Sequence, residues 1–76
     1  MTGDDILHLI VATLARKMGG STRRWRLAVG PIRVHDPATH PHCNWSVSPS
    51  GDARDIAAIE HLLDELRLSH PLVTQR

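Results

Sequence analysis

Residues 22–34 read TRRWRLAVGPIRV, and the spacing of their apolar side chains decides which fold the sequence predicts. Trp25, Leu27 and Val29 alternate with polar or small residues. This period of two is typical of a strand that buries one face. The segment therefore predicts a strand in which Trp25 belongs to the core.

The alternation shifts by one residue at Gly30-Pro31, because the next apolar residues are Ile32 and Val34. Either a bulge within one long strand or a two-residue hairpin explains such a shift. We favour the hairpin, since Gly supplies the positive φ and Pro the negative φ of a type II′ turn. The bulge remains open as an alternative.

A helix is expected before this segment. Thr2 and Asp5 have the spacing of a capping box, and Gly19-Gly20 supplies the stop. Between them an apolar face recurs at helical spacing. Its members are Ile6, Leu7, Ile10, Val11, Leu14 and Met18.

A turn, a strand and a second helix are expected after it. Residues 36–39 (Asp-Pro-Ala-Thr) predict an Asx-type turn, and the alternating run 43–47 predicts the last strand. Asp52 is a suitable N-cap, and His70-Pro71 ends the helix because Pro disfavours α-structure in the residue before it. The apolar stripe of this helix is Ile56, Ile59, Leu62, Leu63 and Leu66.

The sequence thus predicts one small α+β domain over residues 1–76, in the order helix, two- or three-stranded antiparallel sheet, helix (αβββα). Both helices are expected on one face of the sheet. The other face is expected to remain open, with Arg24, Arg26, Asn44 and Ser46 on it.

Composition excludes several classes of protein. Two Trp and no Phe or Tyr argue against an aromatic platform for stacking bases. The single cysteine, Cys43, excludes an intramolecular disulfide, and the longest apolar run, residues 9–12, is too short to span a membrane. A cytoplasmic protein is the expectation.

Two clusters carry candidate chemistry. Five cations within residues 16–26 suit the phosphate backbone of a nucleic acid, although a solvated basic edge paired with the acidic second helix of the same or a neighbouring chain is the plainer interpretation. They are Arg16, Lys17, Arg23, Arg24 and Arg26. Three imidazoles and a thiol suit zinc, although their spacing matches no standard zinc motif and a polar loop accounts for them as well. They are His35, His40, His42 and Cys43.

No set of nucleophile, base and orienting group is evident, so an enzyme is not expected. The leading hypothesis is a small interaction module that binds a protein partner or itself, as a homo-oligomer, through the open sheet face and the loop of residues 35–45. A domain this small is short of core, and its strand edges favour association. Nucleic-acid binding is the alternative, and metal binding the third.

Overall fold

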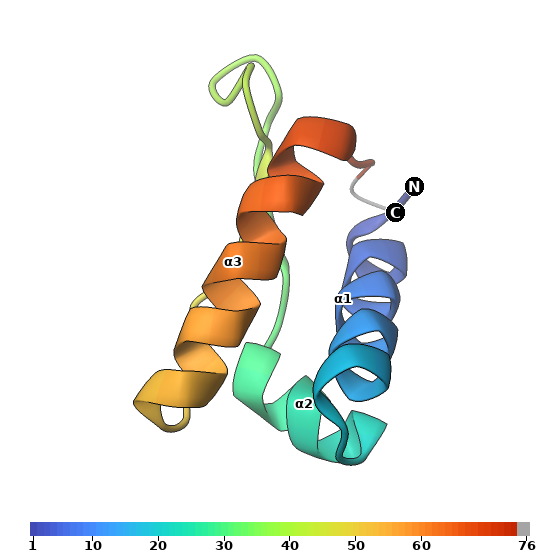
Figure 1. Cartoon of the computed structure of the whole chain (residues 1–76). Helices are drawn as coiled ribbons and strands as arrows, with labels where there is room; N and C mark the ends of the chain where they lie inside the picture. The colour runs from blue at the N-terminus through green and yellow to red at the C-terminus, as the bar shows by residue number, and fades with distance from the viewer. Residues whose placement is uncertain (75–76) are drawn as a thin grey trace.

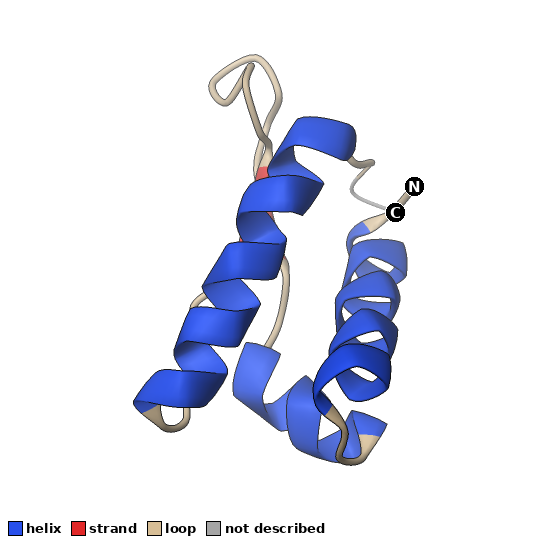
Figure 2. Cartoon of the chain, in the orientation of Figure 1, coloured by secondary structure: helices blue, strands red, loops and turns tan. Residues whose placement is uncertain are grey.

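The computed structural model describes residues 1–74, which form three helices and a short two-stranded antiparallel sheet (Figures 1 and 2). The α+β class is therefore confirmed, whereas the order of elements is α-α-β-β-α. The elements are α1 (Gly3–Met18), α2 (Thr22–Val29), β1 (Arg33–Val34), β2 (Trp45–Ser46) and α3 (Ala53–Ser69).

The two long helices begin and end where the sequence predicts. The Thr2 hydroxyl accepts a hydrogen bond from the Asp5 N–H, and the Asp5 carboxylate accepts one from the Thr2 N–H, so the capping box of α1 is formed. Asp52 caps α3 by accepting from the Asp55 N–H at 2.8 Å. His70, which precedes Pro71, ends α3.

The strand predicted for residues 22–29 is wrong, because this segment is helix α2. Trp25, Ala28 and Val29 lie three and four residues apart, and all three are buried. Leu27, the residue that completed the alternation, is 72% exposed. The buried residues of this segment therefore follow the spacing of a helix and not the alternation of a strand.

The hairpin or bulge predicted at Gly30-Pro31 is wrong for the same reason. Gly30 is the C-cap of α2, and its φ of 73° is the left-handed conformation that glycine adopts readily. Ser21 caps the other end, since its hydroxyl accepts from the Arg24 N–H at 3.1 Å.

The prediction of an open sheet face that carries Arg24, Arg26 and Asn44 is also wrong. Arg24 and Arg26 lie on α2, and Asn44 is only 1% exposed. The sheet itself pairs Arg33 with Ser46 and Val34 with Trp45, two residues to a strand. It is too short to present a binding face of its own.

One hydrophobic core joins the three helices to the hairpin. Trp25 from α2 and Trp45 from β2 are 1% and 2% exposed, so both rings are withdrawn from solvent. Helices α1 and α3 supply most of the other buried apolar residues, and Val73 closes the core near the C-terminus. The full set is Ile6, Ile10, Val11, Leu14, Trp25, Ala28, Val29, Trp45, Ile59, Leu62, Leu63, Leu66 and Val73.

Candidate functional site

The turn between α1 and α2 gathers the cations of residues 16–26 at one end of the molecule. Gly19 and Gly20 have φ values of 80° and 91°, which let the chain turn sharply within the three residues between α1 and α2. The last turn of α1, with Arg16 and Lys17, therefore lies beside α2 and its three arginines (Figure 1). We call Arg16, Lys17, Arg23, Arg24 and Arg26 the basic end.

Arg24 is the member of the basic end that is tied to the rest of the fold. Its guanidinium Nη2 lies 2.8 and 2.9 Å from the two carboxylate oxygens of Asp55, in the first turn of α3. The same guanidinium lies 4.5 Å from the ring centroid of Trp25, a distance suited to a cation–π contact. Arg24 thus anchors α2 against α3.

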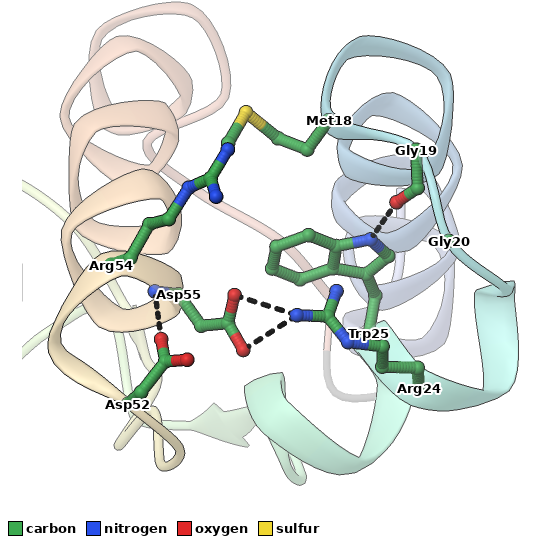
Figure 3. Close-up of a pocket in the computed structure, with 8 residues that line it drawn as sticks. All are labelled: Met18, Gly19, Gly20, Arg24, Trp25, Asp52, Arg54 and Asp55. Carbon is green, nitrogen blue, oxygen red and sulfur yellow. Dashed lines mark hydrogen bonds and ion pairs between the residues drawn. The ribbon is translucent and has the colours of Figure 1, made fainter.

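A cavity of about 280 Å³ opens beside this contact, between the α1–α2 turn and the start of α3. Figure 3 shows Arg54 extending from α3 toward Met18, across the cavity from Trp25. The Trp25 indole N–H donates to the Gly19 carbonyl at 2.8 Å, which fixes the ring as one wall. Arg54 is a further cation of this region that the sequence analysis does not identify. The sequence at the start of α3 does not indicate that this end of the helix packs beside the α1–α2 turn.

The cavity is not itself a strong anion site. It is lined by two guanidinium groups and two carboxylates, from Arg24, Arg54, Asp52 and Asp55, so its formal charges balance. The positive field comes from the exposed cations around it.

Four cations of the basic end are exposed and have no acidic partner among residues 1–74: Arg16, Lys17, Arg23 and Arg26. No Asp or Glu occurs between Asp5 and Asp36 in the sequence, so neither α2 nor the last turns of α1 offer a neutralising carboxylate. The plainer interpretation, a basic edge paired with the acidic second helix, thus applies to Arg24 alone. The other four cations remain available to an anionic partner.

The histidines of the second cluster lie at the opposite end of the molecule, in the hairpin that projects beyond α3 (Figure 1). The rings of His35 and His40 stack at 4.4 Å. His35 Nε2 is 3.0 Å from the Ser46 hydroxyl, and His40 Nδ1 is 2.9 Å from the Thr39 hydroxyl. These contacts match the polar-loop interpretation, as does the predicted turn, in which Asp36 accepts from the Ala38 N–H at 2.9 Å.

Zinc binding by this cluster stays a prediction. Over residues 1–74 the structure brings no three His, Cys, Asp or Glu side chains together in a group able to hold a metal ion. The Cys43 thiol donates to the Trp45 carbonyl at 3.4 Å instead. Binding zinc through His35, His40, His42 and Cys43 requires the hairpin to rearrange.

No protein-family model matches the chain, and neither a curated protein nor a solved structure matches it significantly. Within residues 1–74, none of the helices is both long and apolar enough to cross a membrane. The chemistry of the molecule itself is therefore the guide to its function.

Proposed function

We propose that this protein binds the phosphate backbone of double-stranded nucleic acid through its basic end. The observation that carries the proposal is the set of four exposed cations without an acidic partner among the described residues. Lys and Arg that replace the counterions of a duplex supply most of the affinity of sequence-independent binding. The proposal requires no catalytic group.

The buried tryptophans support a duplex over a single strand. Proteins that bind single strands stack bases on exposed aromatic rings. Trp25 and Trp45 are 1% and 2% exposed, and the chain has no Phe or Tyr. Binding through charge alone therefore follows the phosphates and reads no base, so we expect similar affinity for duplexes of unrelated sequence.

Fluorescence anisotropy with a labelled duplex of random sequence tests the proposal. If all four cations displace counterions, log K falls against log salt with a slope of about −3.6, which weakens binding about 150-fold between about 50 and about 200 mM salt. Absence of binding at the lower salt concentration contradicts the proposal.

The double variant Arg23→Gln/Arg26→Gln locates the interface. Both residues are on α2, line neither the cavity beside Trp25 nor the apolar groove between α1 and α3, and have no ion-pair partner among residues 1–74, so their loss should leave the fold intact. We expect the salt slope to fall by about 1.8, because each lost phosphate contact removes about 0.9. The matched control is Arg67→Gln on α3, whose guanidinium pairs with Asp64 at 3.4 Å, and it should leave the slope unchanged.

Self-association is a second candidate function, favoured by a specific observation. An apolar groove between α1 and α3 is open to solvent. Covering this apolar surface removes it from water, which favours association. The oligomeric state of the protein in solution tests this second function.

A further inference from the structure

Helices α1 and α3 run in opposite directions and leave a groove between them (Figure 1). The groove has a volume of about 100 Å³, and its exposed lining is almost wholly apolar. Leu14 and Met18 line it from α1, and Ala58 and Leu62 from α3. Lys17 of the basic end also lines the groove, whereas Arg16, Arg23 and Arg26 do not. The variant Arg23→Gln/Arg26→Gln therefore leaves the groove unaltered, and the two proposals are tested separately.

Large apolar side chains remain exposed along the same seam. Met18, in the wall of the groove, is 42% exposed. Leu68 is 88% exposed and lies three residues beyond Glu65, on the row of α3 that lines the groove. Burial of these side chains together with the groove would remove apolar surface from water, which favours association.

The two charges at the rim are placed diagonally. Lys17 lines the groove from the last turn of α1, which is the α2 end of the seam. Glu65 lines it from the C-terminal part of α3, which is the other end of the seam because the helices are antiparallel. A two-fold axis that lies in the plane of the interface, perpendicular to the line from Lys17 to Glu65, exchanges these two positions.

We propose that a second copy of the chain covers this groove in a two-fold symmetric dimer, with α1 and α3 of the copies packed face to face. The axis places Lys17 of each copy over Glu65 of the other, so the charges of the surface complement themselves. A head-to-tail arrangement lacks this pairing. Charge complementarity therefore selects a second copy over an unrelated apolar helix as the occupant.

The available area sets the expected strength. Helices of 16 and 17 residues are about 25 Å long and offer roughly 500 Å² per copy when two lie side by side. The total of about 1,000 Å² is at the low end for specific interfaces, where transient complexes are common, so we expect a weak and reversible dimer.

Sedimentation velocity over a concentration series from about 5 to about 500 μM tests the dimer. We expect a reversible shift from monomer to dimer. Lys17→Glu and Glu65→Lys should each weaken the dimer by about tenfold, since each places like charges together. The combined variant Lys17→Glu/Glu65→Lys should restore the original dissociation constant, because it re-forms the pair with its signs exchanged.

Glu60→Lys is the matched control. Glu60 is an exposed acid of α3 that lies outside the groove, so the same reversal of charge should leave the dimer unchanged. Far-ultraviolet circular dichroism verifies that each variant is folded, which is expected because Lys17 and Glu65 are both exposed. A monomer at the highest concentration overturns the proposal, and so does a dimer that ignores the single reversals or is not restored by the combined variant.

Discussion

Asn44 ties the β1–β2 hairpin to the C-terminal segment through its side-chain amide. Its oxygen accepts from the Val73 N–H at 2.8 Å, and its nitrogen donates to the carbonyls of Val73 and His35 at 2.7 and 3.2 Å. Asn44 is 1% exposed and Val73 is 6% exposed, so these groups have little access to water. Three backbone groups therefore depend on one side chain.

Asn44→Ala should destabilise the protein by about 2–4 kcal/mol, because it leaves buried backbone groups without partners. Urea unfolding followed by circular dichroism measures the loss. Ser48→Ala removes an exposed hydroxyl for which no hydrogen bond is found in the described chain, and it should change stability by less than about 0.5 kcal/mol. A loss at Asn44 no larger than that of Ser48→Ala would show that water replaces the amide.

The position of Asn44 illustrates what alternation alone does not reveal. Counting from Trp45 places Asn44 on the face opposite the core, as expected for an exposed residue. In the structure, the backbone N–H of Asn44 donates to the Pro71 carbonyl at 3.0 Å, so the C-terminal segment covers that face. Nothing local to residues 43–47 indicates this long-range contact.

At the scale of elements, α2 depends on its contacts with the long helices. An isolated helix of eight residues is too short to be stable in water. The ion pair between Arg24 and Asp55 and the burial of Trp25 supply the stability that such a short helix lacks.

A double-mutant cycle with Arg24→Gln and Asp55→Asn measures how strongly the ion pair holds α2. The side chains are 49% and 14% exposed, so solvent screens the pair and we expect a coupling energy of about 1 kcal/mol. Arg23→Gln, on the same helix but without an acidic partner among residues 1–74, serves as the control and should show no coupling to Asp55. Additive effects of Arg24→Gln and Asp55→Asn would mean that the pair does not hold the helix.

The capping box of α1 makes stability depend on pH. The Thr2 N–H, which donates to the Asp5 carboxylate at 2.9 Å, and then the Thr2 side chain hold the pKa of Asp5 below its ordinary value of 3.8. A carboxyl with a depressed folded-state pKa stabilises the fold above its unfolded pKa. That contribution is lost as the pH falls from about 3.8 through the lower folded-state pKa.

Thr2→Val should raise the pKa of Asp5 toward 3.8, since it removes the hydroxyl that completes the box. An NMR titration of the Asp5 carboxyl carbon measures the change. Thr22→Val, an exposed threonine of α2 outside the box, should leave the titration of Asp5 as it is in the parent protein. An unchanged pKa in Thr2→Val would mean that the Thr2 hydroxyl has no part in the depression and that the Thr2 backbone N–H causes it without the side chain.

The ends of α1 and α3 follow from the sequence, because capping residues and glycine act over three or four positions. The alternation of apolar residues does not show that α2 is a helix, because a segment of eight residues can fit the strand period of two and the helical period of 3.6 equally well. Trp25 and Val29 are compatible with a strand and with a helix, and only Leu27 and Ala28 distinguish them. Ser21 three residues before Arg24, and Gly30 at the end, are the local signals that favour a helix.

At the scale of the whole molecule, the sequence identifies the cations of the basic end but not their environment. Arg16 through Arg26 are neighbours along the chain, so their proximity requires no tertiary contact. Arg54 joins the region only because the start of α3 packs beside the α1–α2 turn. The same packing brings the Asp55 carboxylate within 2.8 Å of the Arg24 guanidinium. Arg24 is therefore neutralised, whereas within the described chain the other four cations of the basic end are not.

The basic end and the histidine cluster lie at opposite ends of a molecule whose longest dimension is 36 Å (Figure 1). At physiological ionic strength the Debye length is about 8 Å, so charges at one end are screened from the other. The loop of residues 35–45 and the arginines of α2 are therefore not expected to act as one electrostatic binding site. The two ends should act independently.

His40→Gln/His42→Gln tests this independence. Both side chains are exposed in the projecting hairpin, so the variant should keep the parent protein's affinity for duplex within about twofold, whereas Arg23→Gln/Arg26→Gln loses it. In an amide NMR titration with duplex, peaks of residues 16–26 should shift and those of residues 36–43 should not. A threefold or larger loss of affinity in the histidine variant, together with shifts in the hairpin, would mean that the ligand spans the molecule and contacts both ends at once.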